Sequence, residues 1–263
     1  MKKTLILTMV LECVPLVPGR ATEVKQALGS ESQANATMKN ALGAGSGIGA
    51  KDSPVNGFNA GVQIGFVATD SKVKIGAGTL PGMPNINSKS DVSGEGIAGG
   101  VHFGWGYLTD EYIYLGLEAN ANLADADGST SFFILNTPKL TTKVEVTQLY
   151  DLSARFGYLY QNAALPYLKA GIALGHWKAN SKTNVNLSGS SSKYRIGVVV
   201  GAGADIPVNS EFTFGGEYTF STYSSFSHDV SFPNGDNPFR VKVEPKTHSL
   251  MLNMRYKLLN SPF

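Results

Sequence analysis

The sequence is poor in cysteine, in charge and in long apolar runs. Its only cysteine is Cys13, and charged residues make up 16% of its 263 residues, against about 25% in average soluble domains. The net charge of +2 is too small to indicate a nucleic-acid partner. No run reaches the ~18 apolar residues that a membrane-spanning helix needs. Beyond Cys13 the chain can form no disulfide, thiolate metal site or thiol nucleophile, and we expect no cofactor and no metal.

The N-terminus has the pattern of a secretory signal peptide. Lys2 and Lys3 precede a mostly apolar run, and Gly19 and Ala21 are small residues suited to a cleavage site after Ala21. Residues 22–56 are polar, small and rich in glycine, which is typical of a flexible segment. We therefore expect a signal peptide over 1–21, a flexible periplasmic segment over 22–56 and a folded domain over 57–263.

The stretch from Tyr194 to Phe220 separates into two faces. Even positions such as Ile196, Val198 and Val200 are apolar, whereas odd positions carry glycine, threonine and charge. Successive side chains of a strand point to opposite faces, so this alternation predicts two strands joined by a tight turn at 207–210. One apolar face opposite a glycine-rich, charged face suits a lipid-facing barrel wall around a packed polar interior.

Eight stretches of the chain share this alternation. They span approximately 57–69, 96–107, 112–123, 143–158, 167–175, 194–206, 212–220 and 249–258. Val144 and Val146 fall on the apolar face predicted to contact lipid. Connections alternate between long and short, and the long ones are expected over 70–91, 124–141, 180–192 and 221–247.

This arrangement predicts an all-β, eight-stranded, antiparallel up-and-down transmembrane β-barrel in the bacterial outer membrane. Such barrels have an even number of strands, short periplasmic turns and long outer loops. With eight strands, side chains just fill the interior. The alternative is a soluble lipocalin-like barrel or β-sandwich, which would place its bulky apolar face inside. The second face here is too rich in glycine and unlike charges to be a solvated surface.

Several short segments resemble the small porin-like or opacity-type family of outer-membrane barrels, relatives of the transmembrane domain of OmpA. The segments are 151–157 (DLSARFG), 165–171 (LPYLKAG), 201–203 (GAG), 216–218 (GEY) and the closing 249–258. Their order and spacing carry the resemblance over residues 57–258. The resemblance implies recognition of the last strand by the barrel-insertion machinery. Leu258 keeps the strand register and Phe263 breaks it, so either residue is a candidate end of that insertion signal.

Four acids and four bases lie at positions whose side chains are expected to point into the barrel. We predict that they form a layered internal ion-pair network, because buried charges persist only when they are paired and hydrogen-bonded. The predicted members are Glu118, Asp151, Asp205 and Glu217 with Arg155, Lys169, Arg195 and Arg255. One interpretation is structural packing of a narrow barrel. The other is a gated ion or proton path through a narrow pore.

A lipid-modifying barrel enzyme is a further alternative. It would need a His, a Ser and an orienting acid or amide near the outer leaflet. His248 and Ser249 are adjacent, with His228 and Asp229 in the preceding connection, but neighbouring residues of a strand point to opposite faces. We therefore expect no catalytic residues.

Apolar residues in the expected loops also allow two interpretations. Either the strands extend past the bilayer and residues such as Tyr223 and Phe226 pack among them, or the loops bind a host or environmental surface. The function expected from the sequence is a structural or surface-interacting outer-membrane protein. Its expected partners are outer-membrane lipid or lipopolysaccharide, the insertion machinery and a host or surface ligand of the outer loops.

Overall fold

The computed structural model describes residues 53–77, 87–132, 140–160, 163–183, 188–230 and 239–259. The predicted signal peptide over 1–21, residues 22–52 of the predicted periplasmic segment and Phe263 lie outside the described residues. No helix among the described residues is long and apolar enough to span a bilayer.

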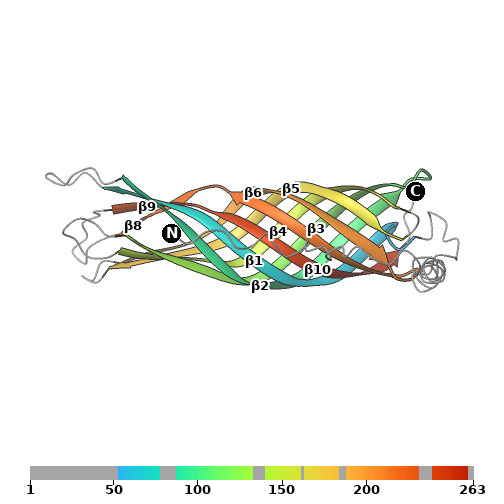
Figure 1. Ribbon diagram of the computed structural model, residues 1–263, viewed down its shortest axis with the longest axis horizontal. Helices are drawn as coiled ribbons and strands as arrows, with labels where there is room; N and C mark the ends of the chain where they lie inside the picture. The colour runs from blue at the N-terminus through green and yellow to red at the C-terminus, as the bar shows by residue number, and fades with distance from the viewer. Residues whose placement is uncertain are drawn as a thin grey trace, which may run out of the picture. The chain divides into compact units, whose positions relative to one another are not determined.

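Eight antiparallel strands close into a ring, as the alternating pattern predicts (Figure 1). Neighbours follow the sequence from β1 to β7, and β10 pairs with both β7 and β1, which closes the barrel. The strands are β1 (Gly57–Ala77), β2 (Asn87–Leu108), β3 (Ile113–Phe132), β4 (Leu140–Tyr158), β5 (Leu165–Thr183), β6 (Ser188–Pro207), β7 (Phe212–Tyr223), β8 (Phe226–Val230), β9 (Phe239–Glu244) and β10 (Lys246–Leu259). The hairpin of β8 and β9 continues β7 and β10 beyond the ring and pairs with the end of β1.

At the end of the barrel where the long connections lie, the strands are longer than predicted. β1 continues to Ala77, β3 continues to Phe132, and β5 and β6 leave only 184–187 between them. The predicted loops over 70–91, 124–141, 180–192 and 221–247 are therefore largely strand, which corrects those boundaries. Short connections join β2 to β3, β4 to β5 and β6 to β7 at the opposite end, the periplasmic end in barrels of this type.

The outer wall of the ring is apolar over its membrane-spanning part. Ile64, Phe66 and Leu168 expose 66%, 68% and 65% of their surface. Exposed apolar patches on soluble monomers rarely exceed a few hundred Å², whereas large apolar side chains project outward here from each of the eight strands of the ring. Lipid is the environment that suits such a wall.

The apolar face changes sides above this wall. On β1, Phe66 faces outward, whereas Val67 and Val73 are buried inside and Lys72 is exposed outside. Beyond the bilayer the outer surface meets water, so the apolar residues belong inside. We call the parts of the strands beyond the bilayer, such as residues 70–77 of β1, the extended strands. Their apolar side chains point inward, as in a soluble barrel, which explains why their pattern differs from that of the lipid-facing wall.

Val144 and Val146 were predicted to contact lipid, and this is wrong. Both side chains are buried in the interior, at 1% and 0% exposure. The pairing of β4 with β5 skips Thr147, and one unpaired residue moves every following side chain to the other face. The inward parity of β4 therefore changes at Thr147.

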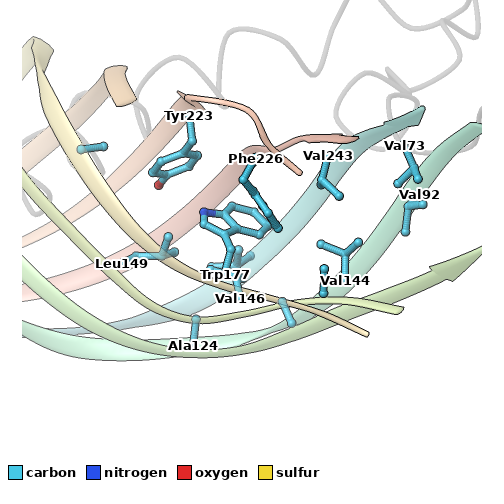
Figure 2. Close-up of a cluster of buried hydrophobic side chains, with 14 of the residues drawn as sticks. Val73, Val92, Ala124, Val144, Val146, Leu149, Trp177, Tyr223, Phe226 and Val243 are labelled. Atoms are coloured by element: carbon cyan, nitrogen blue, oxygen red, sulfur yellow. The ribbon is translucent and has the colours of Figure 1, made fainter. Parts of the chain in front are cut away.

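An extracellular cluster of apolar side chains fills the interior of the extended strands (Figure 2). Trp177 is fully buried there, and its ring centroid lies 5.4 Å from that of Tyr223. Phe226 is buried beside them, together with valines from β1, β2, β4, β8 and β9. The interpretation in which Tyr223 and Phe226 pack among extended strands is the one that the structure shows.

A smaller periplasmic cluster lies at the end with the short turns. It consists of Val55, Leu108, Tyr114, Leu159 and Leu165. Val55 precedes β1, and the carbonyl of Ser53 accepts a hydrogen bond from the Lys257 ammonium at 2.9 Å. Residues 53–56 are therefore buried against the periplasmic end of the barrel.

We predict that cysteine labelling will show this orientation on whole cells. Ser129 is exposed on extended β3, and Ser210 is exposed in the turn between β6 and β7. In a Cys13→Ser background, Ser129→Cys should react with a membrane-impermeant maleimide on intact cells, and Ser210→Cys should react only after the outer membrane is permeabilised. Labelling of Ser210→Cys alone on intact cells would contradict the orientation.

Candidate functional site

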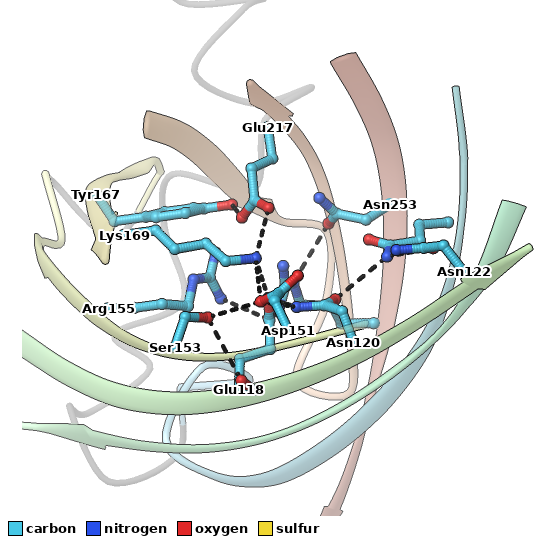
Figure 3. Close-up of polar contacts among 12 residues, drawn as sticks. Glu118, Asn120, Asn122, Asp151, Ser153, Arg155, Tyr167, Lys169, Glu217 and Asn253 are labelled. Carbon is cyan, nitrogen blue, oxygen red and sulfur yellow. Dashed lines mark hydrogen bonds and ion pairs between the residues drawn. The ribbon is translucent and has the colours of Figure 1, made fainter. Parts of the chain in front are cut away.

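Glu118 of β3 lies among the cations of the charged interior, and Figure 3 shows it with Arg155 and Lys169. Its Oε2 pairs with Arg155 Nη1 of β4 at 3.3 Å and makes a close ion pair with Arg255 of β10. Its Oε1 lies 3.5 Å from Lys169 Nζ of β5. Glu118 is 2% exposed, so one buried carboxylate contacts cations from three other strands.

Asp205 of β6 completes a ring of four charges with Glu118 and the two arginines. Its Oδ2 lies 2.8 Å from Arg155 Nη2 and 3.4 Å from Arg255 Nε. Each arginine thus contacts both carboxylates. Planar guanidinium groups suit such double contacts because their donors are arranged in a rigid fork.

Lys169 joins this ring to the remaining two carboxylates. Its ammonium lies 2.8 Å from Glu217 Oε1 of β7 and 3.1 Å from Asp151 Oδ1 of β4. The Tyr167 hydroxyl donates to Glu217 Oε2 at 2.9 Å, and the Tyr167 ring lies 3.5 Å from the Arg155 guanidinium carbon. The aromatic face adds a cation–π contact to the buried arginine.

Glycine makes room for two of these side chains. Gly215 pairs with Asp205, and a Cβ on Gly215 would stand 2.1 Å from Asp205 Oδ1. Gly203 pairs with Glu217, and a Cβ there would stand 2.4 Å from the Tyr167 hydroxyl. The glycines on the inward face therefore leave the space that the charged side chains occupy.

Arg195 does not join the other seven predicted residues. Among the described residues no carboxylate lies within 4.0 Å of its guanidinium, whose carbon lies 5.2 Å from the centre of the Phe226 ring. Its Nε is buried, and no hydrogen-bond partner for it lies in the described part of the chain. The connected network therefore contains four carboxylates and three cations rather than four of each, which leaves one carboxylate in excess.

Uncharged inward residues extend the network and were not predicted as members. The Asn120 amide donates to Glu118 Oε1 at 3.1 Å and to Asp151 Oδ1 at 3.0 Å. Gln63 donates to Asn120 Oδ1 at 3.2 Å and to Asn122 Oδ1 at 2.7 Å. Their inward parity was the only sequence signal, and it did not distinguish them from other polar positions.

A small cavity lies beside Asp151 and Glu217. Its volume is about 30 Å³, and Asn120, Thr219 and Ser249 are among its lining residues. The volume is sufficient for about one water molecule. Larger hollows of about 520–640 Å³ are lined by wall residues such as Leu117, Ile172 and Val200, whose side chains project outward to lipid.

His228 and His248, the histidines considered above, do not form the constellation that a lipid hydrolase needs. His248 contacts the Tyr218 hydroxyl on the outer wall, whereas Ser249 is buried on the inner face. Burial lowers the pKa of His228, whose Nε2 lies 2.9 Å from Ser181 Oγ inside the extended strands. A lipid could not reach a serine in that position.

One serine–histidine pair does lie on the outer surface. His176 Nε2 is 2.9 Å from Ser192 Oγ, and its Nδ1 is 2.7 Å from Thr147 Oγ1. The third group is a hydroxyl, which cannot stabilise a histidine cation as a carboxylate does. We therefore do not assign a catalytic role to this pair.

Comparisons with known proteins agree with the observed fold. Residues 40–257 match the family model of the outer membrane protein beta-barrel domain. The 31 kDa outer-membrane immunogenic protein of Brucella melitensis is 25% identical over 216 residues, 78% of this chain and 86% of that protein. The 25 kDa outer-membrane immunogenic protein of Brucella canis is 31% identical over 134 residues, 50% and 54% of the two chains.

A solved structure shows the same fold without close sequence similarity. The outer membrane protease OmpT from Escherichia coli superposes with a TM-score of 0.50 at 10% identity, over 78% of this chain and 97% of that chain. At this identity the likeness concerns the barrel architecture alone.

The excess carboxylate leads to a prediction about stability. Arg155→Gln leaves Glu118 and Asp205 short of a cation and should lower the free energy of unfolding by about 3–5 kcal/mol. Asp151→Asn removes the excess charge at the edge of the network and should change it by about 1 kcal/mol or less. Urea unfolding of the refolded protein in detergent measures both changes.

The matched control is Arg240→Gln, which removes the exposed pair of Arg240 with Asp229 and should leave the unfolding curve unchanged. Equal losses for Arg155→Gln and Asp151→Asn would contradict the charge count of the network.

Proposed function

The chain belongs to the outer membrane protein β-barrel domain family, and we propose that its barrel is closed to ions and acts by presenting its extended strands at the cell surface. It is an integral protein of the cell outer membrane, and the names of its Brucella relatives describe them as outer-membrane proteins. The observation that carries the proposal is the arrangement of the interior, in which a charged layer lies between two apolar clusters.

Closure is supported by the composition of these layers. An ion that follows the barrel axis would have to pass the extracellular cluster around Trp177 and Tyr223, and then the periplasmic cluster around Leu159 and Leu165. Moving an ion from water into apolar surroundings costs many kcal/mol, and apolar constrictions block conduction by excluding water. Between the two apolar clusters lies the charged network, whose side chains already form ion pairs with one another.

A narrow pore is the rival function, and one observation favours it. The network has an excess carboxylate, Asp151, at the edge of the ≈ 30 Å³ cavity. A cation or proton that entered the barrel would find its most favourable position there. A path of this kind would require both apolar clusters to open.

Surface presentation is supported by the extended strands. Their outer surface carries charged side chains, such as Lys72, Asp127 and Lys182, and their interior has a core of its own. A rigid extension of this kind can hold loops at a distance from the bilayer for binding or recognition. The similar Brucella proteins are named as immunogenic, and we infer the same exposure to antibodies for this chain.

Two further partners belong to this proposal. The loops between the extended strands would contact a surface ligand. The barrel-insertion machinery would read the last strand, β10, on which Leu258 projects outward at 52% exposure.

We predict that the refolded wild-type protein produces no conductance steps in a planar bilayer above those of a protein-free bilayer. Asp151→Asn, which we expect to fold normally, should be equally silent because the closure lies in the apolar clusters and not in the charges. A gel shift between heated and unheated samples serves as the control for folding. Discrete steps in the wild type whose size changes in Asp151→Asn would establish the pore instead.

A further inference from the structure

Three lysines form one row across the outer surface of the extended strands. Lys74 of β1 lies directly opposite Lys89 of β2 on one side and Lys242 of β9 on the other. Val73 and Val243 are fully buried on the inner face, so the row points outward. Like charges placed directly opposite each other destabilise a sheet, and nothing in the pairing of these strands requires lysine at all three positions.

The carboxylates near the row do not balance it. Glu244 Oε1 is shared by Lys74 at 2.6 Å and Lys242 at 3.3 Å. Among the described residues no carboxylate lies within 4.0 Å of Lys72 or Lys89. The neighbouring outward positions hold five cations and three carboxylates, namely Lys72, Lys74, Lys89, Arg240 and Lys242 against Asp91, Asp229 and Glu244.

A gap in the side chains adjoins the row. Gly76 follows two residues after Lys74 and pairs with Arg240. Among the described residues, no atom lies within 4 Å of the position that a Cβ on Gly76 would take. A ligand group of the size of a phosphate could approach the backbone there, with Arg240 beside it and the lysines of the row below.

The height of the row restricts its partner. Phe66 is the last large apolar side chain on the outer wall of β1, and Lys74 lies eight residues further along the strand. At ~3.3 Å per residue and a tilt of ~40°, the row stands roughly 20 Å above Phe66. The polar layer of an ordinary phospholipid leaflet is only about 5–8 Å thick. A lipid that reaches the row must therefore carry a tall anionic headgroup.

We propose that this lysine row binds the phosphorylated saccharide headgroup of the lipopolysaccharide that surrounds the barrel in the outer leaflet. The row faces sideways along the barrel wall, toward neighbouring lipids, and not toward the loop tips, where a ligand from outside the cell would arrive. The lipid's acyl chains lie against the apolar wall while its phosphates reach the lysines. The site is independent of whether the barrel conducts.

The test measures binding of purified lipopolysaccharide with a phosphorylated core to the refolded full-length protein in neutral detergent. The triple variant Lys74→Gln/Lys89→Gln/Lys242→Gln should bind about a hundredfold more weakly than wild type, because each lysine near an anionic membrane surface contributes about fivefold. Raising the salt concentration should weaken wild-type binding more than that of the variant. Dephosphorylated lipopolysaccharide should bind wild type as weakly as the intact lipid binds the variant.

The matched control is Lys143→Gln/Lys178→Gln/Lys182→Gln on the outer face of β4 and β5. It removes the same charge, but Lys143 and Lys178 each pair with a carboxylate of their own, Asp127 at 3.1 Å and Glu145 at 3.7 Å. This control should bind like wild type. Equal losses in the two triple variants, or no loss in either, would overturn the proposal. Tighter binding of a soluble sulfated polysaccharide than of lipopolysaccharide would also overturn it, because the ligand would then come from outside the membrane.

Discussion

The contact of Glu118 with three cations is the interaction on which the interior depends. A buried carboxylate and buried guanidinium groups are tolerated only when each is paired, so Arg155, Lys169 and Arg255 must all reach one residue of β3. This condition restricts where β4, β5 and β10 can lie along the barrel axis relative to β3, although only β4 pairs with β3 directly. Because β10 also closes the ring against β1, the same contact connects the last strand to the middle of the barrel.

The barrel itself could be predicted from the sequence because its wall follows one rule over the whole bilayer. Residues such as Ile64, Ile97 and Leu168 alternate with glycine and polar residues, and only lipid outside and polar packing inside explain that pattern. The strand ends could not be predicted in the same way. Above the bilayer the apolar residues move inside, as Val73 and Val243 show, and the unpaired Thr147 shifts the parity of β4. Where the apolar residues change from the outer to the inner face, the alternation is unclear for a few residues. The sequence there therefore resembles a loop.

The members of the charged layer followed from inward parity, but their partners did not. Parity states which face a side chain occupies and leaves open its position around the ring, which depends on strand order and stagger. Glu118 is central because β3, β4, β5 and β10 all direct side chains to one level of the interior. Arg195 has the correct parity but lies near Phe226, away from the carboxylates. Asn120 and Gln63 belong to the network through amide geometry, which no charge pattern reveals.

The most direct test of this account is a double-mutant cycle between Glu118 and Arg255, the pair that connects β3 to the closing strand. The free energy of unfolding is measured for wild type, Glu118→Gln, Arg255→Gln and the double variant. Our account predicts a coupling energy of about 2 kcal/mol or more, because each single change removes a direct ion-pair contact of the other residue, which stays buried and charged. Effects that add to within about 0.5 kcal/mol would show that the two residues act independently, and Glu118 would then not be the residue that holds the interior together.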